Sequence, residues 1–278
     1  MTGGSAWAAE QAFAIETAAA AGAILMDRYE RLEQIDHKSA RDVVTEADHL
    51  SEELVIAAIR DRFPGDAILA EESGAHPAAS LPVNGRIWVI DPLDGTVNYA
   101  NGLPVFCVSI GVVVNGWPVA GAVFDPTRAE TFAATADGPA TLNGRVIRAS
   151  SKEKLSDGVI SLSLAGRSVA TRARAIRKEI RIARSMGSAA LGIAYVANGR
   201  FDAFVQESGL SAWDVAAAGL IAERAGATVT AFDGSAWYDP GRGSSAAGSI
   251  AGPAAFHARL LALANQRQGR GPWPGQPG

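Results

Sequence analysis

Two carboxylates stand close together where an apolar run meets a Gly-Thr turn, in the segment Trp88-Val89-Ile90-Asp91-Pro92-Leu93-Asp94-Gly95-Thr96-Val97-Asn98-Tyr99. The apolar run has the pattern of a buried strand, and Pro92 is predicted to end it. Asp91 and Asp94 would then project from the strand end. The amides of Gly95 and Thr96 would open a short helix that can seat a phosphate. Carboxylates, a hydroxyl and an anion-binding turn on one loop favour metal-assisted phosphate chemistry.

Further acidic side chains stand at the ends of other apolar elements. They are Glu71 with Glu72 after a short strand, Asp214 at the start of a helix, and Asp48 early in another helix. Two unit charges about 4 Å apart repel by about 4 kcal/mol at an effective dielectric near 20. A cluster of such groups therefore requires cations, and all-oxygen ligands favour hard ions such as Mg²⁺. The alternative is a set of unrelated surface acids at helix starts, where an acid is stabilising.

Several other polar residues admit two interpretations each. Thr96 is either a turn residue or a hydroxyl that orients an attacking water, with Asp48 polarising it. Ser188, in Gly187-Ser188-Ala189 before an apolar helix, is either a plain N-cap or a substrate contact. Lys38 is either a solvated loop charge or a lid residue over the metals.

Other chemistries find no support in the sequence. There is no Gly-x-x-x-x-Gly-Lys-Ser/Thr loop of the kind that NTPases use. The spacing of Asp91 and Asp94 differs from the Asp-x-Asp nucleophile motif of haloacid-dehalogenase-like phosphatases, which argues against an aspartyl-phosphate route. The four histidines lack metal-ligand spacing, so zinc is not expected. Cys107, the single cysteine, lies in an apolar strand and is expected in the core.

The composition is that of a folded protein with a substantial core. Hydrophobic residues make up 48% and charged residues 19% of the 278 residues, which excludes general disorder. The net charge is −4 with no long basic block, so we expect a small phosphorylated metabolite rather than a nucleic-acid polymer as partner. A single cysteine, no signal-like N-terminus and no apolar run of bilayer length favour a cytoplasmic protein without membrane contact.

Hydrophobic periodicity predicts the elements that position these residues. The first half is expected to contain helices, then strands with an Asn-Gly hairpin turn, at 6–30, 45–62, 67–70, 86–90, 105–114, 119–124 and 131–134. Residues 37–41 between the two helices are predicted to be a mobile loop, and the strands after residue 105 an antiparallel meander. The second half is expected to alternate strands and helices, at 159–164, 167–184, 190–197, 202–206, 215–225 and 256–263.

This pattern predicts two halves and a tail. The N-terminal α+β half, residues 1–150, would carry most of the metal ligands. The C-terminal α/β half, residues 151–267, would carry Asp214 and the substrate contacts. Residues 268–278, which are rich in Gly, Pro and Gln, are predicted to be a disordered tail.

Four segments resemble, in the same order, motifs of the inositol monophosphatase family of metal-dependent, lithium-sensitive phosphatases. They are Asp42-Val43-Val44-Thr45-Glu46-Ala47-Asp48, Glu71-Glu72-Ser73, Asp91-Pro92-Leu93-Asp94-Gly95-Thr96-Val97-Asn98-Tyr99 and Trp213-Asp214-Val215-Ala216-Ala217-Ala218-Gly219. The third is highly specific, and the similarity extends from residue 10 to residue 265. The resemblance implies a mixed α+β or α/β fold, a layered αβαβα sandwich, and a homodimer.

The resemblance also implies a set of metal ligands. One ion would be held by Glu71, Asp91 and the backbone carbonyl of Leu93, and a second by Asp91, Asp94 and Asp214. A third, weaker ion would contact Glu71 and waters. The ions would be Mg²⁺, with Mn²⁺ as a substitute and Li⁺ as an inhibitor.

Catalytic and substrate-binding roles follow from the same resemblance. Thr96 with Asp48 would activate the nucleophilic water, beside Glu71, and the amides of Gly95 and Thr96 would hold the phosphate. Without the resemblance Glu207 would be only a rim acid. The implied substrate-binding residues are Asp94, Gly95, Thr96, Gly187, Ser188, Ala189, Glu207 and Asp214.

Two departures from the family pattern stand out. Ala70 occupies a place where the family often has Gly, beside the metal loop. The stretch from Ser163 to Met186, which in the family shapes the substrate pocket and part of the dimer contact, is short in this chain.

The function implied is Mg²⁺-dependent hydrolysis of a small phosphate monoester by direct attack of metal-activated water. Inositol monophosphate or a similar polyol phosphate is favoured as substrate. Fructose 1,6-bisphosphate, histidinol phosphate and 3′-phosphoadenosine 5′-phosphate remain alternatives. The rivals from other classes are a non-catalytic protein that binds a phosphometabolite and a structural homodimer with incidental activity.

Overall fold

An eight-stranded sheet is the largest element of the computed structural model, which describes residues 5–31, 35–39, 42–76, 85–165, 169–239 and 248–265. Its strand order is β10-β9-β8-β7-β6-β5-β3-β4. The strands are β3 (Ala67–Ala70), β4 (Gly74–His76), β5 (Arg86–Asp94), β6 (Cys107–Val114), β7 (Trp117–Asp125), β8 (Glu130–Thr135), β9 (Thr141–Leu142) and β10 (Arg145–Val146). Strands β5 to β8 pair antiparallel, which confirms the predicted meander.

A second sheet has five strands in the order β12-β11-β13-β15-β14. Its members are β11 (Val159–Ser163), β12 (Ile182–Arg184), β13 (Ala203–Gln206), β14 (Thr228–Ala231) and β15 (Ser249–Gly252). Strand β11 pairs parallel with β12 and with β13. The sequence analysis did not anticipate β14 and β15, whose short, small-residue runs carry a weak strand signal.

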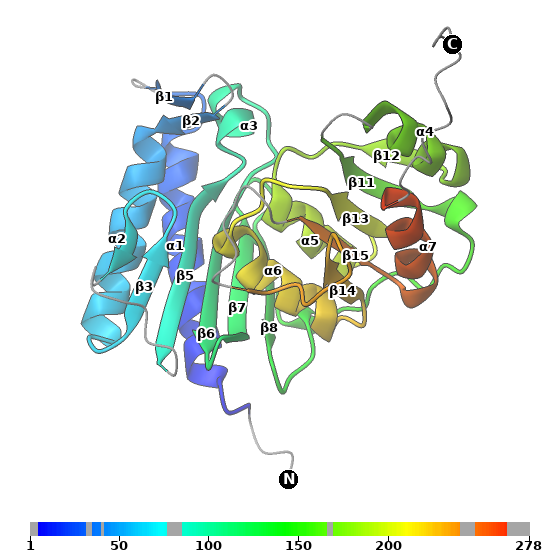
Figure 1. The fold of residues 1–278 in the computed structure, drawn as a ribbon. Helices are drawn as coiled ribbons and strands as arrows, with labels where there is room; N and C mark the ends of the chain where they lie inside the picture. Colours follow the sequence, from blue (N-terminus) through cyan, green and yellow to red (C-terminus); the bar gives the residue numbers. More distant parts are fainter. Residues whose placement is uncertain are drawn as a thin grey trace, which may run out of the picture.

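The outer helices on the side of the larger sheet are α1 (Ala8–Arg28) and α2 (Glu46–Arg62), which pack on each other and on that sheet (Figure 1). The helix predicted over 6–30 is confirmed as α1, in which Ala14, Ala18 and Leu25 are fully buried. The helix predicted from residue 45 is α2, and Thr45 caps it: its hydroxyl accepts a hydrogen bond from the amide of Ala47 at 3.2 Å.

The remaining helices form the middle and the far layers. Helices α5 (Ala189–Ala197) and α6 (Ala212–Arg224) lie between the two sheets, and α4 (Val169–Glu179) and α7 (Ala254–Ala264) cover the far side of the smaller sheet (Figure 1). Three apolar clusters fill the spaces between these layers. The predicted αβαβα sandwich is confirmed, whereas the division near residue 150 stays a prediction.

Two local predictions were wrong. Strand β5 does not end at Pro92 but continues to Asp94, with a register shift between Asp91 and Asp94 against β6. The chain leaves the ladder over these residues, so the missing amide of Pro92 costs no hydrogen bond.

The predicted loop at 37–41 is instead largely strand, because β1 (Ile35–Ser39) pairs antiparallel with β2 (Asp42–Thr45). Residues 40 and 41 lie outside the described residues, as does the predicted tail at 268–278.

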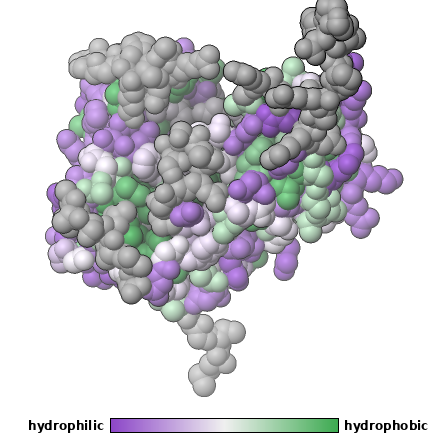
Figure 2. Space-filling model, viewed as in Figure 1, coloured by the Kyte–Doolittle hydropathy of each residue, from purple (hydrophilic) through white to green (hydrophobic). Residues whose placement is uncertain are grey.

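Two short helices complete the described part of the chain, α3 (Thr96–Ala100) and the 3₁₀ turn η1 (Leu155–Asp157). Helix α3 lies at the same end of the large sheet as β1 and β2 (Figure 1). Hydrophilic residues cover much of the left and right margins in this view, with hydrophobic patches between them (Figure 2). Within the described ranges, no helix combines the length and the apolar character that crossing a bilayer requires.

Candidate active site

The parallel pairing of β3 with β5 brings the first two acids together. Ala70 pairs with Ile90, and the amide of Glu71 donates to the carbonyl of Ile90 at 3.2 Å. Glu71 and Asp91 therefore follow the same rung of the ladder, and their side chains are hydrogen-bonded to each other. Ala70 itself is fully buried beneath this loop. The expectation that neighbouring strands would each end in an acid is met by this register.

Three aspartates converge from three parts of the chain. Asp91, Asp94 and Asp214 each offer one carboxylate oxygen, and these oxygens all lie within 4.8 Å of one another. Burial raises the pKa of Asp91, and the carboxylates of Glu71, Asp94 and Asp214 raise it further. Burial likewise raises the pKa of Asp214, with Asp94 adding to the effect.

Asp214 also serves as a helix acid. It is the third residue of α6, and its carboxylate accepts the amide of Ser211 at 2.5 Å in a capping box. This contact confirms the interpretation of Asp214 as an acid at a helix N-terminus, whereas its role as a metal ligand stays a prediction. The capping contact fixes the carboxylate where the chain turns toward Asp91 and Asp94.

A divalent cation fits this set of donors. Among the residues that the structure describes, no lysine, arginine or histidine forms an ion pair with Asp91, Asp94 or Asp214. Buried carboxylates that face one another without a cation repel strongly, and oxygen donors are those that Mg²⁺ prefers. The donor chemistry therefore matches a hard divalent ion.

Thr96 links the turn after β5 to helix α2. Its hydroxyl lies 3.0 Å from Asp48 Oδ1 and 3.0 Å from the carbonyl oxygen of Leu93. The other oxygen of Asp48 accepts from the amide of Thr45 at 2.8 Å and from its hydroxyl at 2.7 Å. Burial raises the pKa of Asp48 to about 6, against the lowering effect of the Thr45 hydrogen bonds. A carboxyl with this pKa is ionised at neutral pH and basic enough to take a proton.

Asp94 connects the large sheet to the N-terminus of α5. Its carboxylate accepts the hydroxyl of Ser188 at 2.5 Å and the amides of Ala189 at 3.0 Å and Ala190 at 2.8 Å. These donors lower the pKa of Asp94, but burial outweighs them and the net shift is upward. Ser188 is the residue before α5, yet its hydroxyl bonds Asp94 rather than capping its own helix.

A cavity of about 260 Å³ opens beside this junction. Of the predicted substrate-binding residues, Asp94, Gly187, Ser188, Ala189 and Asp214 line it. Gly95, Thr96 and Glu207 are not among the lining residues, and the carboxylate of Glu207 is instead paired with Arg172. The further lining residues, which the sequence analysis did not single out, are Ser161, Ser163, Ser185, Met186, Phe204, Gln206 and Gly209.

Sequence reasoning also missed the role of Asn98. Its amide nitrogen donates to the carbonyls of Val105 at 2.7 Å and Met186 at 2.8 Å, so it joins the turn after β5 to one side of the cavity. A Cβ at Gly187, which has φ +69°, would lie 2.9 Å from this amide. Asn98 belongs to the motif from Asp91 to Tyr99, so the sequence pointed to this residue, but only the fold shows which carbonyls it contacts.

The layered fold and the cluster of buried carboxylates at the end of β5 match the architecture expected of a metal-dependent phosphatase. The model of the inositol monophosphatase family matches residues 7–268, and the chain belongs to that family of phosphoric monoester hydrolases. The resemblance drawn from the four motifs is thereby confirmed.

Relatives and solved structures agree with this assignment. The chain is 37% identical over 232 residues to Nus factor SuhB of Pseudomonas aeruginosa, covering 80% of this chain and 85% of that protein. It is 38% identical over 227 residues to an inositol-1-monophosphatase of Synechocystis, covering 79% and 78%. The solved structure of an IMPase from Thermotoga maritima is similar with a TM-score of 0.82 and 32% identity, covering 92% of this chain and 97% of that one.

Proposed function

We propose that this protein hydrolyses a small phosphate monoester in a Mg²⁺-dependent reaction, with inositol monophosphate or a similar polyol phosphate as substrate. The observation that carries the proposal is the convergence of Asp91, Asp94 and Asp214 without a cationic side chain among the described residues. Family membership supports the reaction class. Relatives named inositol-1-monophosphatase, in Synechocystis and Mesorhizobium japonicum, support the choice of a polyol phosphate.

The metal ligands in this proposal are those that the family resemblance implies. Glu71, Asp91 and the carbonyl of Leu93 would hold one ion, and Asp91, Asp94 and Asp214 a second. Bound divalent ions would neutralise the phosphoryl oxygens, lower the pKa of water and stabilise the leaving alkoxide. Mn²⁺ as a substitute, Li⁺ as an inhibitor, the homodimer and a cytoplasmic location remain parts of the proposal.

The chain's own residues would orient the attacking water and receive its proton. Thr96 stands 3.0 Å from Asp48, so its hydroxyl can pass a hydrogen bond from a water to that carboxylate. Asp48, with a pKa of about 6, is ionised at neutral pH. It would accept the proton of the attacking water while keeping its hydrogen bonds with Thr45. The amides of Gly95 and Thr96 would hold the phosphate, and Ser188 with Ala189 would contact the alcohol.

A substrate panel tests the proposal. Phosphate release from inositol 1-phosphate, fructose 1,6-bisphosphate, histidinol phosphate and 3′-phosphoadenosine 5′-phosphate would be measured with Mg²⁺, with and without Li⁺. We expect the highest kcat/KM with inositol 1-phosphate, and loss of activity with Li⁺. Thr96→Val should lower kcat about 100-fold or more, the usual scale of general-base assistance.

Thr127→Val is the matched control, because the Thr127 hydroxyl also bonds a buried aspartate, Asp125, at 2.7 Å. We expect its kcat to change less than threefold. No phosphate release from any of the four esters with Mg²⁺ or Mn²⁺ would refute the proposed reaction. Saturable binding of an ester without release would then favour a non-catalytic phosphometabolite-binding protein.

A further inference from the structure

Helix α2 carries three buried polar residues on one side. Asp48, Ser51 and Glu52 stand three and four positions apart and therefore share a helix face. Asp48 accepts the hydroxyl of Thr96. The Ser51 hydroxyl donates to the carbonyl of Pro92 at 2.9 Å. The proposed reaction gives a role to the first of the three and leaves Ser51 and Glu52 without one.

Glu52 binds the turn that joins β3 to β4. One of its carboxylate oxygens, Oε2, accepts the amide of Glu72 at 2.9 Å. The other, Oε1, accepts the amide of Ser73 at 2.9 Å and the hydroxyl of Ser73 at 2.5 Å. The Glu52 residue is 4% exposed, and no lysine, arginine or histidine in the described ranges forms an ion pair with it. Three donors from one turn therefore satisfy this buried carboxylate, and such charge-assisted hydrogen bonds are about twice as strong as neutral ones.

The same turn carries Glu71, the proposed metal ligand. The turn is short, since Ala70 and Gly74 at its two ends pair with each other. Its three successive amides all have partners outside it: the amide of Glu71 donates to a carbonyl of β5 at 3.2 Å, and the next two donate to Glu52. The conformation of the turn, and with it the position of the Glu71 carboxylate beside Asp91, therefore depends on these outside partners.

A histidine extends the contact to β4. His76 Nε2 lies 2.7 Å from the hydroxyl oxygen of Ser73. Because the single hydroxyl hydrogen of Ser73 is donated to Glu52, the oxygen accepts this hydrogen bond and His76 Nε2 donates it. A row of hydrogen bonds from His76 through Ser73 to Glu52 thus joins β4 to α2 across the turn.

Helix α2 therefore supports both loops that bring the proposed ligands together. Glu52 holds the turn after β3, and Ser51 holds the carbonyl of Pro92, which stands between Asp91 and Leu93 in the sequence. Strands β3 and β5 are parallel neighbours, so the two loops leave the sheet at the same edge. Beyond the last pair of the ladder, contacts from one rigid helix face set the distance between them.

We infer that Glu52 is a positioning residue for the metal site: its carboxylate holds the turn that carries Glu71 and thereby sets the affinity for the divalent ion. This inference rests on the proposed function, in which Glu71 is a metal ligand. Glu52 bonds the two residues that follow Glu71, so it acts through the backbone of the turn. Outer partners that orient metal ligands commonly change metal affinity 10–100-fold.

Calorimetric titration of the metal-free protein with Mg²⁺, without substrate, tests the inference. Glu52→Gln preserves the side-chain volume but sets an NH₂ group against one of the donors of the turn. It should weaken Mg²⁺ binding about tenfold. Glu53→Gln is the matched control, because it removes the same charge from the next residue of α2, whose side chain is exposed. Its Mg²⁺ affinity should change less than twofold. Equal affinities in folded Glu52→Gln and the unaltered protein would overturn the inference.

A double-mutant cycle separates positioning from a general effect on stability. Glu71→Ala removes the ligand that Glu52 is inferred to position. In that background, adding Glu52→Gln should weaken Mg²⁺ binding less than twofold further, because the position of the turn no longer matters to the ion. A full tenfold loss in the double variant as well would show that Glu52 acts independently of Glu71, which overturns the inference.

Hydrogen exchange provides a readout that requires no metal. The amides of Glu72 and Ser73 should exchange about tenfold faster in metal-free Glu52→Gln than in the unaltered protein, because their acceptor is weakened. If Glu52→Gln does not fold, Ser73→Ala carries the test. It removes only the hydroxyl contact at an exposed residue and should weaken Mg²⁺ binding about threefold. Unchanged exchange in Glu52→Gln, or unchanged affinity in Ser73→Ala, overturns the inference.

The inference and the proposed function fail in different ways. Phosphate release together with equal Mg²⁺ affinities in all these single variants at Glu52, Glu53 and Ser73 would overturn the inference and leave the proposed function intact. The expected differences in affinity, without phosphate release from any of the four esters, would refute the proposed reaction and support the positioning role of Glu52.

Discussion

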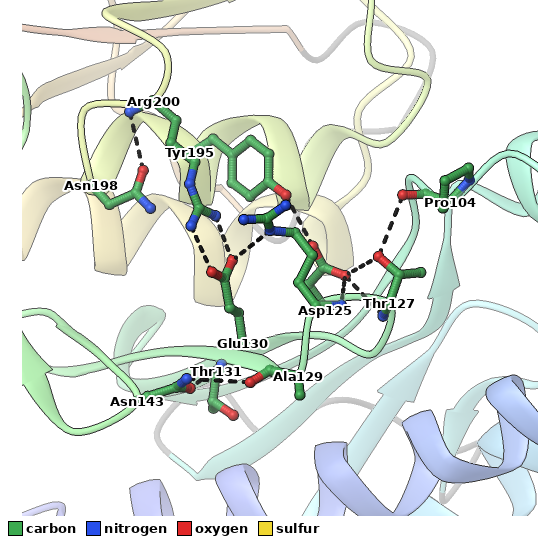
Figure 3. Close-up of polar contacts among 11 residues, drawn as sticks. Pro104, Asp125, Thr127, Ala129, Glu130, Thr131, Asn143, Tyr195, Asn198 and Arg200 are labelled. Carbon is green, nitrogen blue, oxygen red and sulfur yellow. Dashed lines mark hydrogen bonds and ion pairs between the residues drawn. The ribbon is translucent and has the colours of Figure 1, made fainter.

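Asp91 and Asp125 are both 1% exposed, yet their surroundings differ completely. Asp125, at the end of β7, accepts the amide of Thr127 at 3.0 Å, its hydroxyl at 2.7 Å and the hydroxyl of Tyr195 at 2.9 Å (Figure 3). Asp91 accepts the amide of Leu93 at 3.1 Å and otherwise faces further carboxylates.

The acids beside these two follow the same division. Glu130, near Asp125, pairs with both terminal guanidinium nitrogens of Arg200 (Figure 3). Its carboxylate also lies 3.1 Å from Nε of Arg128. Its pKa is lowered, chiefly by the hydrogen bonds from Arg200. Asp94 and Asp214, near Asp91, also accept hydrogen bonds, but their pKa values are raised because burial outweighs those bonds. Acids that face only donors stabilise the fold, whereas acids that also face one another are arranged for a cation, and no described side chain supplies one.

The matched pair Asp91→Asn and Asp125→Asn sharpens this comparison most. Asp91→Asn should lower kcat/KM about 1,000-fold or more, about 4 kcal/mol of transition-state stabilisation, because it removes the proposed shared ligand. Asp125→Asn should keep kcat/KM within threefold but lower the free energy of unfolding by about 2 kcal/mol, since it weakens charge-assisted hydrogen bonds. Phosphate-release kinetics and urea unfolding measure the two effects. Near-normal Mg²⁺-dependent turnover by Asp91→Asn would break the comparison.

Adding Mg²⁺ distinguishes the acid cluster around Asp91 from that around Asp125 by its effect on the stability of the folded protein. Mg²⁺ at 100 times its dissociation constant should stabilise the folded protein by about 2.7 kcal/mol, because it binds the folded acid cluster and not the unfolded chain. Thermal unfolding with and without Mg²⁺ measures this shift. It should be abolished in Asp91→Asn and retained in Asp125→Asn. A Mg²⁺ shift of equal size in Asp91→Asn would place the ion elsewhere.

The smallest expected effect is the change that one substitution makes to the pH dependence of stability in the metal-free protein. The folded pKa values of Asp91, Asp94 and Asp214 are raised, so the folded state binds more protons than the unfolded state above pH ~4. Stability should therefore fall as pH rises from there through the raised values, by up to about 1.4 kcal/mol per pH unit for each proton.

Urea unfolding across that window, in the presence of a chelator, measures the slope. Asp91→Asn should reduce this slope, because it removes one carboxyl group with a raised pKa and the repulsion of that group on its neighbours. Glu130→Gln is the control with the opposite sign: the lowered pKa of Glu130 gives stability above its unfolded pKa that is lost as pH falls. An unchanged slope in Asp91→Asn would show that the pH dependence of stability does not come from this cluster.

Much of the site was predictable because it is local. The turn from Asp91 to Thr96, the helix that begins near residue 45 and the strand before Glu71 depend on residues a few positions apart. The elements that were missed or misplaced depend on distant partners. The strand at 35–39 forms by pairing with 42–45, and β15 lies between β13 and β14. Pro92 is tolerated in β5 because the ladder with β6 shifts register there.

The sequence by itself determined the reaction class, since the spacing of Asp91, Asp94 and Thr96 within one turn fixes their chemistry wherever that turn lies. Only the tertiary structure decided which other groups meet them. Asp214 reaches the cluster through the position of α6, and Glu207 meets Arg172 of α4 just after the end of β13. Side chains close in sequence share a backbone conformation, whereas the face that a strand residue presents depends on neighbours far along the chain.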